Sequence, residues 1–291
     1  FGGRMKENVE RCGAAAVIVQ DEWGTAVDPQ KVEDAIRAHP GAKVLAFVHA
    51  ETSTGARSDA ATLCALARQH GLLTIVDTVT GLGGIDVNVD GWGADAVYSG
   101  TQKCLSCIPG LSPVTFSSRA QEVIQKRQHK VQSWFLDMGL VMAYWGGSHQ
   151  RAYHHTAPIN MLYGLHEALV ILEEEGLENA WARHARHHTA LAAGLAALGI
   201  DFVVDVGHRL PQLNCVRIPA GVDDGQIRRQ LLQEYGLEIG AGLGPLAGKV
   251  WRIGLMGFAA NRTNVLLCLG ALEALLGRSG AVAAARGFYA S

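Results

Sequence analysis

The feature that most constrains this chain is a series of short apolar runs that alternate with helical stretches in its first third. The runs are typical of strands and comprise residues 14–19, 43–50, 72–78 and 95–100. Residues 28–39 and 58–71 have a helical pattern with a capping residue at the start, such as Asp28, and a glycine after the end. Strands that are apolar throughout and alternate with helices form a parallel sheet with helices on both faces. The sequence therefore predicts an α/β fold.

The second half of the chain has a different pattern. Leu162, Leu165, Leu169 and Leu172 are spaced like one face of a helix, and a second long helix is predicted over 179–198. Short strands and helices then mix, which is typical of a smaller α+β domain. We predict a large domain over 1–165, and a linking helix with a small C-terminal domain over 166–291. The last residues, from 281, are predicted to be a frayed or disordered tail.

Composition excludes several classes of protein. The chain has 25 Lys and Arg against 27 Asp and Glu, a formal net charge of −2, whereas nucleic-acid binding needs a clustered basic excess. No apolar run reaches the roughly 18 residues of a membrane span. The six cysteines are scattered without a disulfide framework, which fits a reducing compartment. We therefore expect a cytoplasmic protein with neither nucleic acid nor membrane as a partner.

The sharpest chemical signal lies at the ends of two predicted strands. Asp77 ends the strand over 72–78, and Lys103 lies just past the strand over 95–100. In such sheets ligands bind beyond the carboxyl ends of the strands. A lysine amine and a carboxylate there are the groups that pyridoxal phosphate requires, one for a Schiff base and one for the pyridine nitrogen. Taken singly, Lys103 also reads as a solvated loop lysine and Asp77 as a turn cap.

Other tempting residues have plainer explanations. Cys104 and Cys107 form a lone CxxC without the second pair of a zinc site, so no metal site is predicted. His184, His187 and His188 have helical spacing but no nearby carboxylate, which favours a solvated helix face.

Several ordered motifs give the chain a family resemblance. They are HAETSTG (49–55), VDTVTGLGG (76–84), YSGTQK followed by PGLSP (98–113), YHHT (153–156), GLENAW (176–181) and GLGPLAGKVWRIGLMG (242–257). The chain resembles the class V, fold-type I pyridoxal-phosphate aminotransferases, in particular the alanine–glyoxylate, serine–pyruvate and serine–glyoxylate aminotransferases. The resemblance runs from Phe1 to about residue 276. It implies that a segment carrying part of the site precedes Phe1.

The resemblance implies roles for residues around the cofactor. Lys103 matches the Schiff-base lysine, and Asp77 matches the partner of the pyridine nitrogen. Val79 matches the apolar residue against the ring face. Thr52 matches a small hydroxyl residue that contacts the cofactor, and Gln102 a phosphate contact.

More distant residues receive roles in the same way. Tyr153 and Thr156 match residues that reach the cofactor phosphate of a neighbouring subunit, which implies a homodimer. Arg252 matches the arginine that binds the substrate carboxylate; by itself it also reads as a strand residue paired with a surface acid. Phe1 matches an aromatic residue stacked on the ring.

The implied activity is transfer of an amino group from alanine or serine to glyoxylate or pyruvate, with pyridoxal 5'-phosphate as cofactor. The alternatives are a cysteine desulfurase or lyase of the same fold, and an inactive truncated fragment. A nicotinamide dehydrogenase is a further class, but its glycine fingerprint is absent from the sequence.

Overall fold

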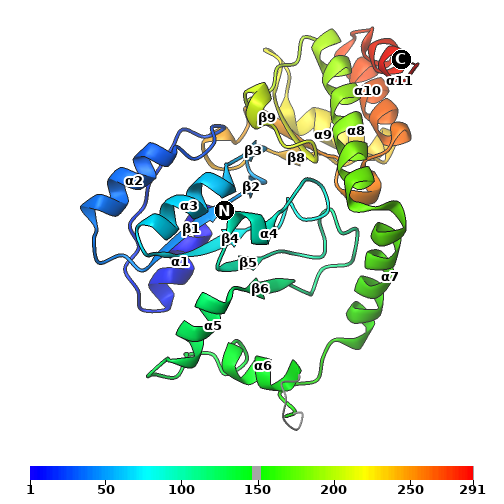
Figure 1. Cartoon of the computed structure of the whole chain (residues 1–291). Coiled ribbons are helices and arrows are strands. Elements are labelled where there is room, and N and C mark those ends of the chain that lie inside the picture. The colour runs from blue at the N-terminus through cyan, green and yellow to red at the C-terminus, as the bar shows by residue number, and fades with distance from the viewer. Residues whose placement is uncertain (146–151, 291) are drawn as a thin grey trace.

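The computed structural model describes residues 1–145 and 152–290, which form two bodies connected by a long helix (Figure 1). The first body is built on a sheet with the order β1-β4-β5-β6. Its strands are β1 (Val44–Val48), β4 (Leu73–Asp77), β5 (Ala96–Tyr98) and β6 (Val114–Phe116). The first three are parallel, and β6 is antiparallel to β5. The predicted α/β class is confirmed.

The first four helices of this body are α1 (Gly2–Arg11), α2 (Pro29–Ala38), α3 (Ala60–Gln69) and α4 (Val89–Trp92), and a small ribbon pairs β2 (Ala50–Glu51) with β3 (Ala56–Arg57). Three of these four helices begin at a residue whose side chain caps the first turn; α1, which begins after Phe1, has no such cap. The Asp28 side chain accepts a hydrogen bond from Gln30 N at 2.8 Å, and Asp59 accepts one from Thr62 N at 3.0 Å. Each carboxylate thus satisfies an amide that the first helical turn leaves unpaired.

The two faces of the sheet differ in their cover. Phe47, Val76 and Val97 lie on one face and pack with Leu63 and Cys64 of α3. On the opposite face Val44 and Ile75 are 44% and 37% exposed. The second face is therefore less well covered than the first at these two positions.

Residues 14–19 form no strand, so that prediction is wrong. Val17 and Ile18 are more than half exposed, and none of the strands in the described chain pairs with this run. A strand requires a neighbour that completes its hydrogen-bond ladder. Apolar, β-branched residues alone do not supply one.

A series of helices connects the two bodies. After α5 (Ser118–Gln125) and α6 (Met138–Trp145), the chain continues through α7 (Ile159–Glu175) into α8 (Leu177–Ala197). α7 runs along the edge of the molecule in Figure 1, whereas α8 lies in the second body. The domain division that we predict at 165/166 falls within α7 and stays a prediction.

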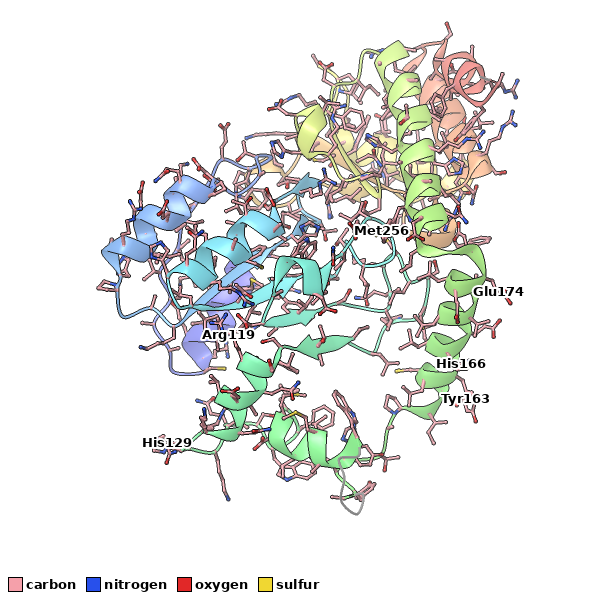
Figure 2. The ribbon with its side chains drawn as sticks, in the orientation of Figure 1. Arg119, His129, Tyr163, His166, Glu174 and Met256 are labelled. Atoms are coloured by element: carbon pink, nitrogen blue, oxygen red, sulfur yellow. The ribbon has the colours of Figure 1, made fainter. Side chains whose placement is uncertain are left out.

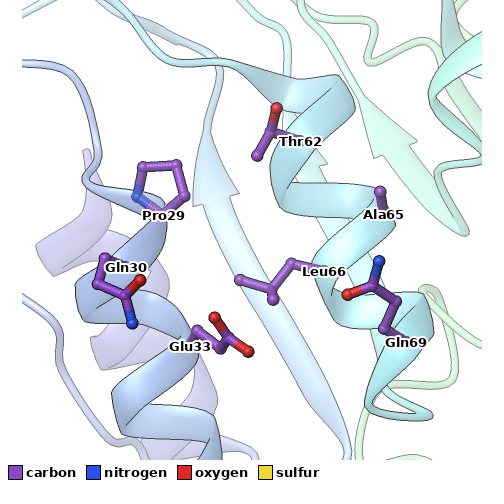
Figure 3. A pocket seen from close by; sticks show the side chains of 7 residues that line it. All are labelled: Pro29, Gln30, Glu33, Thr62, Ala65, Leu66 and Gln69. Carbon is purple, nitrogen blue, oxygen red and sulfur yellow. The ribbon is translucent and has the colours of Figure 1, made fainter.

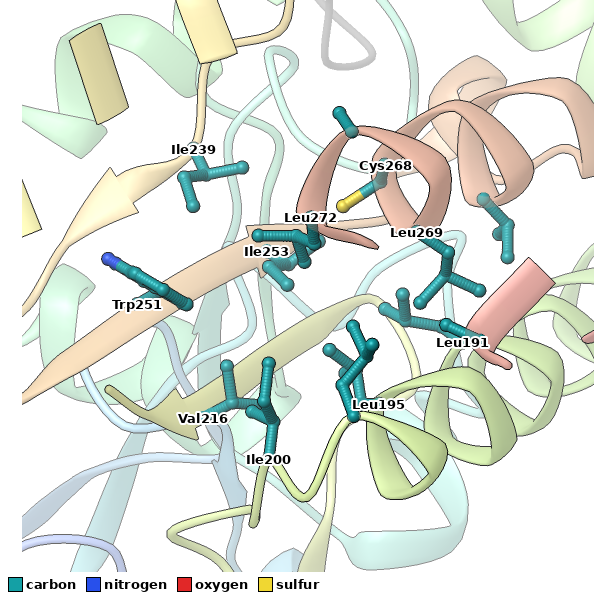
Figure 4. Packing of buried hydrophobic residues seen from close by; sticks show 14 of the residues in the cluster. Leu191, Leu195, Ile200, Val216, Ile239, Trp251, Ile253, Cys268, Leu269 and Leu272 are labelled. Carbon is teal, nitrogen blue, oxygen red and sulfur yellow. The ribbon is translucent and has the colours of Figure 1, made fainter. Parts of the chain in front are cut away.

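The second body has its own sheet and core. Strands β7 (Leu213–Arg217), β9 (Val250–Gly254) and β8 (Gly240–Ala241) are antiparallel in that order. Helices α9 (Asp224–Tyr235), α10 (Arg262–Leu276) and α11 (Ala281–Ala290) pack with α8 against it. Leu191, Leu195, Trp251, Leu269 and Leu272 fill the core (Figure 4).

The C-terminal segment is ordered, contrary to the predicted disordered tail. α11 buries Ala281 and Ala285 completely and contacts α8 and α10. Its run of alanines favours a helix, and the small alanine side chains permit close packing. The sequence alone does not show this packing. None of the helices within the described residues has the length and apolarity to cross a membrane.

Candidate active site

Asp77 occupies the carboxyl end of β4, where the parallel strands of the first sheet finish. Its side chain is buried, Oδ1 accepts a hydrogen bond from Val79 N at 2.9 Å, and Oδ2 accepts one from the Tyr98 hydroxyl at 2.7 Å. Burial raises the pKa of this carboxyl, while both hydrogen bonds oppose the rise. Among the described side chains Asp77 has no salt-bridge partner, so a cationic ligand group would stabilise its ionised form.

Lys103 lies in a tight turn that follows β5. Ser106 N donates to Lys103 O at 3.0 Å, and Cys107 N donates to Thr101 O at 3.1 Å. Ser106 has a φ of 58°, a conformation that non-glycine residues rarely adopt. The Lys103 side chain is half-buried, and within the described chain its amine has neither a hydrogen bond nor a salt bridge. The turn therefore presents an amine without a protein partner.

Thr80 joins the Asp77 loop to the rest of the site. Its hydroxyl is hydrogen-bonded to the Thr52 hydroxyl, and its carbonyl accepts from Gln212 Nε2 at 2.9 Å and from Cys104 Sγ at 3.5 Å. One residue thus connects the loop after β4, the loop after β2, the Lys103 turn and the second body. Our sequence reasoning missed both Thr80 and Gln212. Thr80 lies within the VDTVTGLGG motif and could have been found there, but nothing in the sequence marks Gln212.

Arg252 reaches the site from β9 in the second body. Its Nε donates to Ala241 O at 2.8 Å, and its Nη1 donates to Thr52 O at 3.2 Å. Partial burial lowers the pKa of this guanidinium from its usual value. Within the described chain the second terminal nitrogen, Nη2, has no hydrogen-bond partner. The structure therefore holds the guanidinium through Nε and Nη1 and leaves Nη2 available.

An apolar cluster supports the junction of the two bodies. Ala50 and Ile85 of the first body pack with Leu210 and Leu213 of the second, and Met256 lies against them. Figure 2 shows Met256 between the second body and the loops of the first sheet. The segment that carries Arg252 is thus fixed beside the strand ends.

The remaining predicted site residues of the first body lie near the carboxyl ends of the strands and are less buried than Asp77. The Phe1 amino group donates to Glu51 Oε2 at 2.7 Å, next to Thr52, and the Phe1 side chain is partly exposed. Val79 is half-buried, and Gln102 is exposed beside Lys103.

Tyr153 and Thr156 are not brought to the other predicted residues. Their hydroxyls are hydrogen-bonded to each other at 2.8 Å, and Tyr153 is 74% exposed. Among the described contacts none connects either residue to Asp77, Lys103 or Arg252.

The polar hollow shown in Figure 3 lies elsewhere, between α2 and α3. Its volume is about 280 Å³, and it is lined by Pro29, Gln30, Glu33, Thr62, Ala65, Leu66 and Gln69. No predicted site residue lines it, so it plays no part in the candidate site.

The histidines of α8 are not a solvated face, and that prediction is wrong. His184 is fully buried and His187 nearly so. His187 Nδ1 lies 2.6 Å from the Tyr289 hydroxyl, and His188 Nδ1 lies 2.6 Å from Asn214 Oδ1. This side of α8 packs against α11 and the strand segment rather than against water. No group of three or more metal-ligating side chains gathers anywhere in the described residues.

The site residues fit pyridoxal 5'-phosphate. Among the described residues, the buried Asp77 carboxylate has no salt-bridge partner, and the Lys103 amine has neither a hydrogen-bond nor a salt-bridge partner. A pyridine nitrogen and an aldehyde are the groups that such a pair accommodates. Arg252, whose Nη2 has no hydrogen-bond partner in the described chain, suits the carboxylate of an amino acid.

Comparisons with known proteins agree with this chemistry. The model of the family "Aminotransferase class-V" matches residues 5–254. The chain is 39% identical to the (S)-ureidoglycine–glyoxylate transaminase of Bacillus subtilis, over 97% of this chain and 71% of that protein. It is 39% identical to the alanine–glyoxylate aminotransferase of Callithrix jacchus, over 95% of this chain and 67% of that protein.

A solved structure has the same fold. The crystal structure of alanine–glyoxylate aminotransferase from Nostoc sp. superposes with a TM-score of 0.92 and 46% sequence identity, over 95% of this chain and 72% of that one. The resemblance inferred from the motifs is confirmed. The chain belongs to the class V aminotransferases, a family of enzymes that use pyridoxal 5'-phosphate.

Proposed function

We propose that this enzyme transfers an amino group from a small α-amino acid, alanine or serine, to glyoxylate or pyruvate. The observation that supports this proposal is the series of hydrogen bonds that joins Arg252 to Thr52, Thr52 to Thr80, and Thr80 to Cys104, the neighbour of Lys103. Asp77 lies three residues before Thr80. The names of the relatives support glyoxylate as the acceptor, since both curated relatives are glyoxylate transaminases.

Each residue has a distinct task in this reaction. When bound, pyridoxal 5'-phosphate supplies an electron sink that allows the Cα–H bond of an amino acid to break. Asp77 holds a proton on the pyridine nitrogen, since its buried carboxylate is stabilised by a cation. The Lys103 amine would hold the cofactor and would take the proton from the substrate Cα. Arg252 would bind the substrate carboxylate through Nη2 and so orient that Cα.

Residues whose roles were assigned only by resemblance complete the proposal. Val79 packs against the ring, Phe1 stacks on it, and Thr52 and Gln102 contact the cofactor. Tyr153 and Thr156 serve the site of a second copy in a homodimer, which is consistent with their exposure. The six free thiols are consistent with a reducing cytoplasm.

Transamination is favoured over cysteine desulfurization by the state of Cys104, one of the two thiols near Lys103; the other, Cys107, is half-buried. A desulfurase requires an accessible thiolate. Cys104 is buried against the Thr80 carbonyl, and burial raises the pKa of its thiol to about 12. Cys104 is therefore a packing residue rather than a nucleophile.

Lys103 can be tested directly. The chain is incubated with pyridoxal 5'-phosphate, desalted, scanned for absorbance, reduced with borohydride and mapped by peptides. We expect a yellow, reducible adduct on Lys103. Lys103→Ala abolishes the adduct and lowers turnover at least about a thousandfold, while the exposed Lys126→Ala retains both. An adduct on another lysine contradicts the assignment, and a colourless wild-type chain supports the inactive-fragment alternative.

The substrates are tested separately. Alanine, serine and cysteine are compared as donors, with glyoxylate, pyruvate and 2-oxoglutarate as acceptors. We expect the highest kcat/KM for alanine or serine with glyoxylate. Sulfide release from cysteine would favour the desulfurase alternative.

A further inference from the structure

One buried histidine of the second body is connected to the turn that carries Lys103. His184 Nδ1 lies 2.6 Å from Ala180 O, and Gly257 N donates to His184 Nε2 at 2.9 Å. A carbonyl only accepts and an amide N–H only donates, so Nδ1 carries the proton and Nε2 is bare. The ring is therefore neutral and in a single tautomer, and both of its nitrogens are hydrogen-bonded.

The loop that His184 holds lies directly on the Lys103 turn. Phe258 N donates to Ser106 Oγ at 2.8 Å, and Ser106 N donates to Lys103 O at 3.0 Å. Gly257 has a φ of 55°, and a Cβ there would collide with Ser106 Oγ and lie 3.0 Å from Cys104 O. The loop thus packs directly on the turn, and the Ser106 side chain joins them.

Arg183 binds the backbone carbonyl groups of the same loop. Its Nη1 donates to Gly257 O at 2.7 Å and to Ala260 O at 3.1 Å, while Glu175 pairs with the rest of the guanidinium. Adjacent residues of α8 thus engage both the N–H and the C=O of Gly257. This arrangement fixes the orientation of the Gly257 peptide groups.

We propose that His184 is a positioning residue for Lys103, acting through Gly257 and Ser106. The fixed loop stabilises the left-handed conformation of Ser106, and that conformation closes the turn on Lys103 O. The inference rests on the proposed role of Lys103 as the cofactor-bearing residue. It also makes a claim about the turn that holds without any cofactor.

Two substitutions of His184 distinguish the roles of its two ring nitrogens. His184→Gln places an amide oxygen near the position of Nε2 and retains an acceptor for Gly257 N. His184→Asn reaches only as far as Nδ1 and removes that acceptor. His187→Asn is the matched control, because His187 is on the same helix but contacts Tyr289 instead.

The first readout is amide hydrogen exchange of the full chain without cofactor. In His184→Asn we expect the Ser106 and Cys107 amides to exchange about tenfold faster, the size of one lost buried hydrogen bond. Exchange in β4 should not change, and His184→Gln and His187→Asn should match the wild type. Unchanged exchange in His184→Asn, or equal acceleration in His187→Asn, overturns the proposal. If His184→Asn does not fold, Ser106→Ala breaks the same connection from the exposed side and should accelerate Cys107 alike; unchanged exchange there also overturns it.

The second readout is the pH titration of the absorbance of the cofactor adduct. A misplaced amine changes the titration midpoint, which loss of stability alone does not. We expect a shifted midpoint in His184→Asn, restored in His184→Gln. A midpoint equal to that of the wild type in His184→Asn overturns positioning. If the wild type forms no adduct, the proposed function fails, and the exchange result still decides whether His184 holds the turn.

Discussion

The second body buries its apolar side chains in a core, whereas helix α7 does not. In the second body, side chains from α8, β7, β9 and α10 enclose one another, and Leu191, Trp251 and Leu269 are fully buried. α7 spans 17 residues and buries none of them. A helix without buried residues, α7, is thus followed within a few residues by a helix, α8, that enters a closed core.

The difference shows that apolar content does not by itself indicate stability. Leu162, Leu165, Leu169 and Leu172 form the continuous face that the sequence predicts, and they line a groove of about 390 Å³ with Leu82, Leu105 and Leu111. Leu105 lies in the Lys103 turn, so α7 forms one wall beside the site. The groove remains open, so these leucines contribute far less burial than those of the second body.

The largest effect should come from leucines of the two regions. Leu269→Ala should lower the free energy of unfolding by about 3 kcal/mol, since it leaves a cavity in a closed core. Leu169→Ala, on the half-exposed face of α7, should change it by less than about 0.5 kcal/mol. Urea denaturation of both variants measures the contrast. Equal losses would show that α7 is as tightly packed as the core.

The second prediction tests whether Arg252, in the second body, contributes to substrate binding and not to the stability of the fold. Arg252→Ala should raise the KM for the amino donor about a hundredfold, the loss of one charge-assisted contact with the substrate carboxylate. Its melting temperature should stay near that of the wild type. Arg217→Ala on neighbouring β7 serves as the control and should leave KM unchanged. An unchanged KM in Arg252→Ala would remove that residue from the substrate site.

The third prediction concerns acid. Burial lowers the pKa of His184, and the Arg183 charge adds to that effect while Glu175 opposes it; burial also lowers the pKa of His188. Above pH 6.5 these rings are neutral in both the folded and unfolded states. As the pH falls below that value the unfolded chain takes up protons first, so stability declines toward the lowered folded pKa.

The melting temperature should therefore fall between about pH 7 and pH 5, with a shallower slope in His184→Gln. Amide exchange at both pH values should locate the earliest loss in α8. A slope that is the same in the variant would mean that His184 titrates normally.

The smallest effect concerns Asp77 in the first body. Burial raises the folded pKa of this carboxyl above its unfolded value of 3.8, so its favourable contribution is lost as the pH rises through the folded pKa. At neutral pH without cofactor, Asp77→Asn should therefore stabilise the chain by about 1 kcal/mol. The same variant should lose the adduct absorbance, whereas exposed Asp86→Asn should change neither. Destabilisation by Asp77→Asn would indicate a structural role instead.

The sequence predicts the elements and the chemistry better than it predicts the connections between them. Asp77 and Lys103 could be placed because strand ends can be located from apolar runs and their motifs are local. The contacts of Thr80 with Gln212 and of His184 with Gly257 could not be, because they join segments more than 70 residues apart. Residues 14–19 and the C-terminal helix were misjudged for a related reason: pairing and packing with distant segments, rather than local composition, decided their structure.

The route of the backbone between the bodies has a consequence for how such enzymes diversify. The chain passes from the first core to the second once, through α7 into α8. A recombination event in that stretch exchanges the whole second body as a module. Arg252 would travel with the module, whereas Asp77 and Lys103 would remain. With the proposed roles, the residue for the substrate carboxylate and the residue for cofactor attachment would thus lie on separable parts of the chain.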